Sequence, residues 1–372
     1  MKLLNYLKEE TIINTKNLAY ILFKRKDIKS FKNYIMARAT VANVGPGFPH
    51  AIYRKFPSLV PYPREIEVEI TTRCHLKCTH CEHTYWSDEH NRDLTFEEYK
   101  HILSQFPNLW WINTTGEGSS FLNKDFVRML EYTKSKGIFI KFVESFTNLT
   151  EEQMETIIKV GVERLYVSME GATAETYEKI RIGASFNKVI ENLKTFRELK
   201  KKLRSPLPEV SYRYVVMKEN YHELPDFVRL IKSLDLGNTI NVVGTLDFDE
   251  IKHLSIKERQ EHIEELLRIA DDLDMDTPIG DTITQPPITR CTCWVQPYIM
   301  IGGYIMPCCG VMMANRRTFL RENALGNIFE APFKEIWNSP RYKALREGMT
   351  KSKGPLDPMC VGCRSFDTLG RR

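Results

Sequence analysis

The sequence has no apolar run that approaches the roughly 18 residues needed for a membrane-spanning helix. The longest apolar run near the N-terminus, Leu18–Phe23, is short and is followed by lysine and arginine. The N-terminus also lacks the apolar stretch and small-residue cleavage site of a secretory signal peptide. We therefore expect a cytoplasmic protein without a membrane partner.

The chain also lacks a strong excess of charge of either sign. It has 53 Lys and Arg against 48 Asp and Glu, so the net charge is +5 over 372 residues. Such a small and scattered excess does not indicate nucleic-acid binding. Hydrophobic residues make up 42 % and charged residues 27 %, which is ordinary for a globular chain able to bury a large core.

The cysteines do not form an even set that could pair completely in disulfides. The chain has nine of them. In a reducing compartment, cysteines at short spacings are more often metal ligands than disulfide partners. They fall into one group near residue 78 and a second group after residue 290. We therefore expect two metal-binding centres.

Between residues 65 and 280, short apolar runs alternate with segments of helical spacing. Capping boxes at Thr95 and Thr150 mark two of the helix starts. Six strands alternating with helices predict parallel βαβ units in an α/β fold, either an open sheet or a partial (β/α)6 TIM-like barrel. In such folds the functional face lies at the carboxyl ends of the strands. The strands are expected at residues 66–70, 109–113, 138–143, 165–169, 210–216 and 239–243.

Two flanking regions depart from this alternation. Residues 1–64 are basic and aromatic and predict one or two helices followed by a loop. Residues 281–372 contain six cysteines, a hairpin signal at Gly302-Gly303 and a short helix from about 333 to 347. We therefore divide the chain into an N-terminal extension (1–64), a barrel (65–280), whose last helix is expected from 255 to about 273, and a metal-binding C-terminal domain (281–372).

The first cysteine group has the spacing C-x3-C-x2-C and consists of Cys74, Cys78 and Cys81. Three thiolates bound to a [4Fe–4S] cluster leave one iron without a protein ligand, and that iron can bind a cofactor or substrate. The alternative is a zinc site with a nearby histidine (His75, His80 or His83) as the fourth ligand. The position of the group directly after the first strand favours the iron–sulfur cluster.

Three cysteines at this place in a βα alternation resemble the signature of the radical S-adenosylmethionine (radical SAM) superfamily. The resemblance implies that the open iron binds S-adenosylmethionine and that reductive cleavage yields a 5′-deoxyadenosyl radical. It also implies a reductant such as flavodoxin or ferredoxin. His80 stands where the family usually has an aromatic residue near the adenine.

Thr114-Thr115-Gly116-Glu117 follows the second strand and resembles the family's G-G-E-P motif, which binds the methionyl amino group. Gly116 allows the backbone to approach the ligand, and the carboxylate of Glu117 can pair with an ammonium group. The sequence departs from the motif at Thr115 and at Gly118, which replaces the proline. Asn148, after the third strand, matches the T-N pair found there in the family.

Ser168 ends the fourth strand in a segment that resembles the family's S-x-D-G, with Glu170 in place of aspartate. Arg181 follows thirteen residues later. The resemblance implies that Ser168 and Arg181 hold the cofactor's carboxylate, which suits the planar fork of arginine. The alternative for Arg181 is a surface position on a helix.

The second cysteine group resembles the SPASM/twitch extension of radical SAM enzymes. Its features are C-x9-G-x4-C ending at Cys308, the pair Cys308-Cys309, and C-x2-C at the end of the group. The resemblance implies an auxiliary [4Fe–4S] cluster, and six cysteines suit the shorter, one-cluster form. Spacing leaves open which member of each close pair is a ligand, although Gly303-x4 favours Cys308, and a zinc ribbon is the alternative. The candidate ligands are Cys291, Cys293, Cys308, Cys309, Cys360 and Cys363.

These motifs predict hydrogen abstraction from an unactivated carbon. Residues 1–64 lack the strand–helix pattern of a leader-binding domain, so we expect a small or carbohydrate-like substrate that is dehydrogenated or epimerised. Maturation of a ribosomal peptide or protein is one alternative, and a non-catalytic zinc-binding module is another. No residue is assigned as a general base, although Glu144, Tyr212, Tyr214 and Asp247 are candidates to face the cavity.

Overall fold

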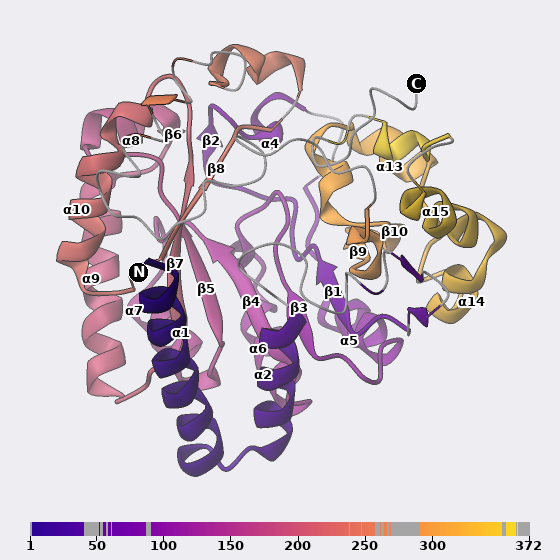
Figure 1. Ribbon diagram of the computed structural model, residues 1–372, viewed down its shortest axis with the longest axis horizontal. Helices are drawn as coiled ribbons and strands as arrows, with labels where there is room; N and C mark the ends of the chain where they lie inside the picture. The colour runs from indigo at the N-terminus through magenta and orange to yellow at the C-terminus, as the bar shows by residue number, and fades with distance from the viewer. Residues whose placement is uncertain are drawn as a thin grey trace.

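The computed structural model describes residues 2–40, 62–86, 91–256 except 238 and 247, 291–351, and 355–363 except 362, with scattered residues in 52–60 and 261–268. An eight-stranded sheet in the order β10-β9-β1-β3-β4-β5-β7-β8 runs through it (Figure 1). Six neighbouring strands are parallel, which confirms the α/β partial barrel. They are β1 (Glu65–Val68), β3 (Trp111–Asn113), β4 (Phe139–Glu144), β5 (Arg164–Ser168), β7 (Glu209–Val215) and β8 (Thr239–Val243).

Amphipathic helices cover the outer face of this sheet (Figure 1). Outward-facing side chains of β1, such as Ile66 and Val68, pack in one core with side chains of these helices. Both bonds of the capping boxes at Thr95 and Thr150 are formed, as the sequence predicts. The helices are α5 (Phe96–Ser104), α6 (Phe126–Ser135), α7 (Glu151–Val160), α8 (Ala174–Ile180), α9 (Phe186–Lys202) and α10 (Leu224–Leu234).

The N-terminal extension forms a helical hairpin, drawn in indigo in Figure 1. It consists of α1 (Lys2–Ala19), the π-helical turn η1 (Tyr20–Lys24) and α2 (Ile28–Thr40). Tyr34 packs against Phe139 with ring centroids 5.6 Å apart, and both share a buried cluster with Trp111. Because Trp111 and Phe139 are the first residues of β3 and β4, the hairpin covers the amino end of the barrel. None of the described helices is long and apolar enough to cross a membrane.

The C-terminal region continues the barrel sheet. β9 (Tyr298–Met300) lies parallel to β1, and β10 (Tyr304–Met306) returns antiparallel to β9. The amides of Glu67 and Glu69 donate to the carbonyls of Pro297 and Ile299, each at 3.0 Å. The predicted hairpin is thus present, and it joins the two parts of the chain through backbone hydrogen bonds.

The helix predicted from 333 to 347 is wrong in one respect, because the structure has two helices there. α14 (Phe333–Asn338) ends at Ser339, and α15 (Pro340–Thr350) begins with proline, which lacks the amide that a continuous helix would use. The Ser339 hydroxyl accepts from the amide of Tyr342 and caps the second helix. The helix predicted from 255 to 273 lies largely outside the described residues.

Candidate active site

A cavity of about 370 Å³ opens at the carboxyl ends of the barrel strands. It brings together most of the residues predicted to bind the first cluster and its cofactor. Asn148 is exposed and lies outside this lining. The predicted residues that line the cavity are Cys74, Cys78, His80, Cys81, Gly116, Glu117, Ser168 and Arg181.

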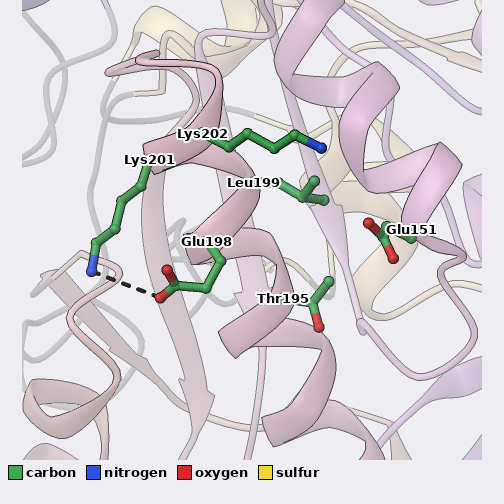
Figure 2. Close-up of a pocket in the computed structure, with 6 residues that line it drawn as sticks. All are labelled: Glu151, Thr195, Glu198, Leu199, Lys201 and Lys202. Atoms are coloured by element: carbon green, nitrogen blue, oxygen red, sulfur yellow. Dashed lines mark ion pairs between the residues drawn. The ribbon is translucent and has the colours of Figure 1, made fainter.

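A second hollow, of about 440 Å³, lies on the outer surface between α7 and α9 (Figure 2). Its lining is mostly polar. The lining includes an ion pair in which Lys201 Nζ lies 3.8 Å from Glu198 Oε1. None of the residues predicted to bind a cofactor or cluster lines it. The internal cavity is therefore the candidate active site.

The three cysteines of the first group are held by a small second sheet. β2 (Lys77–Cys78) pairs antiparallel with β6 (Arg181–Ile182), so that Cys78 lies opposite Arg181. The Thr79 amide donates to the carbonyl of Ile180 at 2.9 Å. This pairing fixes the cysteine loop to the segment that carries Arg181, and it was not foreseen because both strands are only two residues long.

The three thiols are free and suit a metal cluster. Burial raises the pKa of Cys78 to about 11 and raises the pKa values of Cys74 and Cys81 as well. Thiols in such surroundings become thiolates only when a metal or another cation stabilises the charge. The three thiols therefore fit a metal centre whose positive charge would stabilise their ionised forms.

Two of the histidines proposed as alternative zinc ligands, His83 and His80, have surroundings that differ from each other. His83 Nε2 lies 2.9 Å from the carbonyl oxygen of Thr72. Burial lowers the pKa of His80 to about 4, so its imidazole is neutral at pH 7 in the cavity wall. Among the described residues, no three His, Cys, Asp or Glu side chains gather as a single metal ion requires.

An acidic corner adjoins the cysteines. Arg317, the first residue of α13 (Arg317–Glu322), forms a two-pronged ion pair with Glu69 at 3.0 and 2.5 Å. The same guanidinium lies 2.9 Å from Glu117 Oε1. Burial, followed by the neighbouring Glu82, raises the pKa of Glu117 to about 8, against the lowering effect of Arg317.

Two carboxylates, those of Glu69 and Glu117, therefore share one guanidinium at this corner, and the carboxyl group of Glu82 lies nearby. Such an excess of acid fits the cationic amino group of a bound ligand, which charge-assisted hydrogen bonds would hold. The sequence indicated Glu117 but not Glu69 or Arg317. The sequence did contain a signal for Glu69. Acidic residues alternate through β1 and the residue after it, which places Glu65, Glu67 and Glu69 on one face. No local signal marked Arg317, which lies 248 residues away from Glu69.

Arg181 is buried, so the alternative of a surface helix position is wrong. Its guanidinium forms a two-pronged pair with Glu170, including a 3.1 Å bond from Nη2 to Oε1. Nη1 also lies 3.8 Å from Cys78 Sγ. The glutamate that replaces the family's aspartate thus anchors Arg181 beside the cluster loop.

The residues named as possible general bases lie in different places. Tyr212 and Tyr214 do not face the cavity, because they point to the outer face of β7 and donate to the carbonyls of Leu236 and Asn220. Glu144 does line the cavity, where its Oε1 accepts the Ser145 amide. Asp247 lies outside the described residues.

The second cysteine group gathers beside the β9–β10 hairpin. Gly310 lies between two of the thiols, since a Cβ at this position would be 3.4 Å from Cys308 Sγ and 3.9 Å from Cys363 Sγ. The Cys363 amide donates to the Cys360 carbonyl at 3.2 Å. Burial raises the pKa of Cys308, and the neighbouring thiols Cys293, Cys309, Cys363 and Cys360 raise it further.

The thiol of Cys309 has a different surrounding. Its hydrogen-bond partner is Glu67, on the inner face of β1, and Lys141 of β4 lies nearby. Cys291 and Cys293 remain together at the other side of the group, where the Cys293 amide donates to Cys291 Sγ at 3.3 Å. Cys309 therefore differs from Cys308 in having Glu67 as a partner, although both thiols lie near Cys293.

Comparison with known proteins assigns families to both parts of the chain. The model of the radical SAM superfamily matches residues 68–231, and that of the SPASM iron–sulfur cluster-binding domain matches residues 291–364. These spans coincide with the sheet and cysteine groups described above.

Curated relatives include proteins that align over most of both chains. The cofactor-modifying protein of the tungsten-containing aldehyde ferredoxin oxidoreductase of Pyrococcus furiosus is 27 % identical, over 81 % of this chain and 87 % of its own. The AdoMet-dependent heme synthase of Methanosarcina barkeri is 24 % identical, over 82 % and 91 %. The PqqA peptide cyclase of Bradyrhizobium diazoefficiens is 25 % identical over 46 % of this chain and 44 % of its own.

Solved structures share the fold. Streptococcus suis SuiB bound to the precursor peptide SuiA has a TM-score of 0.59 at 16 % identity, covering 86 % of this chain and 73 % of that one. The enzyme anSMEcpe with bound AdoMet has a TM-score of 0.59 at 18 % identity, covering 83 % and 86 %.

Proposed function

Because this chain belongs to the radical SAM superfamily and carries a C-terminal SPASM domain, we propose that it abstracts hydrogen from a carbon of its substrate. Cys74, Cys78 and Cys81 would hold the [4Fe–4S] cluster. The cluster and S-adenosylmethionine supply the 5′-deoxyadenosyl radical when they are bound. The observation that carries this proposal is that the three thiols share one cavity with Glu117, Ser168 and Arg181.

The side chains of the cavity have separable tasks in this proposal. Glu117, in the acidic corner with Arg317, binds the amino group of the methionyl moiety. Ser168 contacts its carboxylate, and Arg181 lies close enough to Cys78 to stabilise the thiolate. The apolar side chains of Val143 and Val215 form part of the wall and help exclude water.

For the substrate, we infer a ribosomal peptide or a protein. The carbohydrate-like substrate expected from the sequence gains no support, since none of the relatives named above is named for a carbohydrate. PqqA peptide cyclase is named for a peptide, although it aligns over less than half of this chain.

A second candidate is a small organic cofactor or its precursor. The two relatives that align over most of both chains are named for modifying a cofactor and for synthesising heme. In either case we propose a one-electron reductant such as flavodoxin or ferredoxin and an oxidoreductase outcome. The auxiliary cluster would accept the second electron. A cytoplasmic, reducing location suits nine cysteines for which the described residues show no disulfide.

The activity test uses anaerobically reconstituted protein, dithionite and S-adenosylmethionine, with 5′-deoxyadenosine measured by mass spectrometry. We expect product from the wild type and none from Cys78→Ala. Product formation by Cys78→Ala equal to that of wild type would refute the assignment of the first cluster.

The substrate class can be tested without knowing the substrate. Lysate from cells grown in deuterated medium is fractionated by size and added to the reaction, because hydrogen abstraction transfers one deuterium to 5′-deoxyadenosine. A peptide substrate predicts that protease treatment of the active fraction abolishes the label. Label that survives protease would favour the small-molecule candidate.

A further inference from the structure

A layer of polar side chains lies inside the barrel, beneath the cofactor cavity. Side chains alternate between the faces of a strand, and the inward positions of β4 and β5 that line the cavity are Val143 and Ser168. Two residues earlier on the same strands, Lys141 and Tyr166 occupy the next layer down. Arg213 of β7 pairs in register with Ser168 and itself lines the cavity.

Two cations of this layer rest on aromatic rings. Lys141 Nζ lies 3.9 Å from the centroid of the Trp111 ring. The Arg213 guanidinium lies 5.5 Å from the centroid of Tyr166, and its buried Nε has no hydrogen-bond partner. Among the described residues, no carboxylate lies within ion-pairing distance of either cation.

Unlike Lys141 and Arg213, three buried arginines have carboxylate partners. Arg164 pairs with Glu209 at 2.9 Å, Arg181 pairs with Glu170, and Arg317 pairs with Glu69. Glu67 of β1 and Lys141 both lie near the Cys309 thiol, and Glu67 is the hydrogen-bond partner of that thiol. Lys141 and Arg213 are half-buried and have no acidic partner among the described residues, so this layer is suited to an anion from outside the chain.

The pKa of Tyr166 indicates the same local excess of positive charge. Arg164 Nη1 donates to its hydroxyl oxygen at 3.5 Å. Burial raises the pKa of a phenol, yet the pKa of Tyr166 lies below its usual value because Arg164, Lys141 and Arg213 surround it. Its O–H remains able to donate to a ligand between the cations.

We propose that Lys141 and Arg213, with the Tyr166 hydroxyl, bind an anionic oxygen group of the substrate, either a carboxylate or a phosphate. This inference rests on the proposed function, since the group would belong to the molecule whose carbon reacts in the cavity above. It narrows the substrate to an acidic peptide segment or an acidic small molecule. Arginine and lysine are the usual residues for such groups.

The test needs no knowledge of the substrate. Thermal unfolding of reconstituted holoenzyme, without and with saturating S-adenosylmethionine, is measured in phosphate, in succinate and in chloride at equal ionic strength. Binding to the folded state raises the melting temperature, and we expect a rise on the order of 2–4 °C in the anion that fits. The response should be absent in Lys141→Met/Arg213→Met and retained in Lys141→Arg.

The choice of variants separates this response from general salt effects. Lys134→Met removes the buried ammonium of α6 that pairs with Glu163, so it should lower the melting temperature and keep the anion response. If the double variant does not fold, Lys141→Gln and Arg213→Gln carry the same comparison. Phosphate and succinate identify which acidic group the site prefers.

Three results would overturn the inference. The first is an equal anion response in wild type and variants, which means non-specific stabilisation. The second is a response that disappears once S-adenosylmethionine is bound, which assigns the cations to the cofactor's carboxylate. The third is a lower melting temperature for Lys141→Met in chloride, which means that the ammonium is structural. Formation of 5′-deoxyadenosine is measured separately, so failure of this inference and failure of the proposed function are distinguishable.

Discussion

At the scale of single residues, the adjacent cysteines Cys308 and Cys309 differ in their partners. Cys308 has four neighbouring thiols, whereas Cys309 is hydrogen-bonded to Glu67 of the barrel and has Cys293 nearby. We expect Cys308→Ser to lose the auxiliary cluster, which reduces the iron content from about eight to about four per chain. Cys309→Ser should keep about eight, because serine can retain the hydrogen bond to Glu67. Iron and sulfide analysis decides this, and equal losses in both variants would contradict it.

Glu117 offers a second test at this scale. Replacing it with glutamine keeps the shape but removes the charge that a cationic amino group needs. We expect Glu117→Gln to weaken S-adenosylmethionine binding about tenfold, which corresponds to ~1.4 kcal/mol for a lost charge-assisted bond. Binding is measured by equilibrium dialysis of the oxidised holoenzyme. Glu191→Gln, on the exposed face of α9, is the control that should bind as wild type does. An unchanged affinity for Glu117→Gln would remove Glu117 from the cofactor site.

At the scale of elements, the N-terminal hairpin is stabilised mainly by what it covers. Tyr34 is 1 % exposed against Phe139, whereas its neighbour Ile35 is 45 % exposed. Truncating a fully buried aromatic side chain costs about 3–5 kcal/mol. We therefore expect Tyr34→Ala to lower the melting temperature markedly and Ile35→Ala to leave it nearly unchanged. Similar shifts in the two variants would show that the hairpin does not pack on the barrel as described.

Lys200, near the end of α9, makes the stability of the folded protein depend on pH. Burial lowers the pKa of Lys200 to about 8, although its ammonium donates to the carbonyls of Pro206 and Pro208. The unfolded chain, with a lysine pKa near ~10.4, binds more protons than the folded chain between pH 8 and that value. The contribution of Lys200 to stability therefore rises with pH across this window and is lowest below pH 8.

Melting temperatures of wild type and Lys200→Met between pH 7 and 10 test this sign. We expect the difference to shift in favour of the wild type as the pH rises. Lys201→Met, at a 57 % exposed side chain, should run parallel to the wild type. A Lys200→Met curve that is also parallel would show that Lys200 has an ordinary pKa.

Elements were easier to predict than contacts between them. Each of the six parallel strands is a short apolar or alternating run, so local pattern alone located them within two residues. The prediction that Tyr212 and Tyr214 could face the cavity was wrong, because side chains alternate along β7 and the inward positions are those of Ser211 and Arg213. That prediction rested on the chemistry of the tyrosine side chain and not on the face of the strand. The β2–β6 pair and the ion pair of Arg317 join segments more than 100 residues apart, and one sequence carries no local signal for such contacts.

At the scale of the whole molecule, the auxiliary region and the barrel form one structure. β9 hydrogen-bonds to β1, and Arg317 reaches from α13 to Glu69 and Glu117 beside the first cluster loop. Removing the guanidinium leaves two buried carboxylates without their cation, and breaking a buried pair in this way costs about 3–5 kcal/mol. Removal of the guanidinium should therefore destabilise both the barrel and the auxiliary region.

We expect Arg317→Met to increase amide hydrogen exchange together at Glu67 and Glu69, whose amides join the β1 segment to the β9 segment, and at Ile305 of β10, whose amide donates to the Gly326 carbonyl. Arg316→Met is the matched control, since Arg316 pairs with Glu250 at an exposed position and should leave the exchange unchanged. Exchange that rises only in β9 and β10 would mean that the auxiliary region opens independently of the barrel. A joint rise, accompanied by weaker S-adenosylmethionine binding, would mean that the auxiliary domain helps to set the electrostatics of the cofactor site through this one arginine.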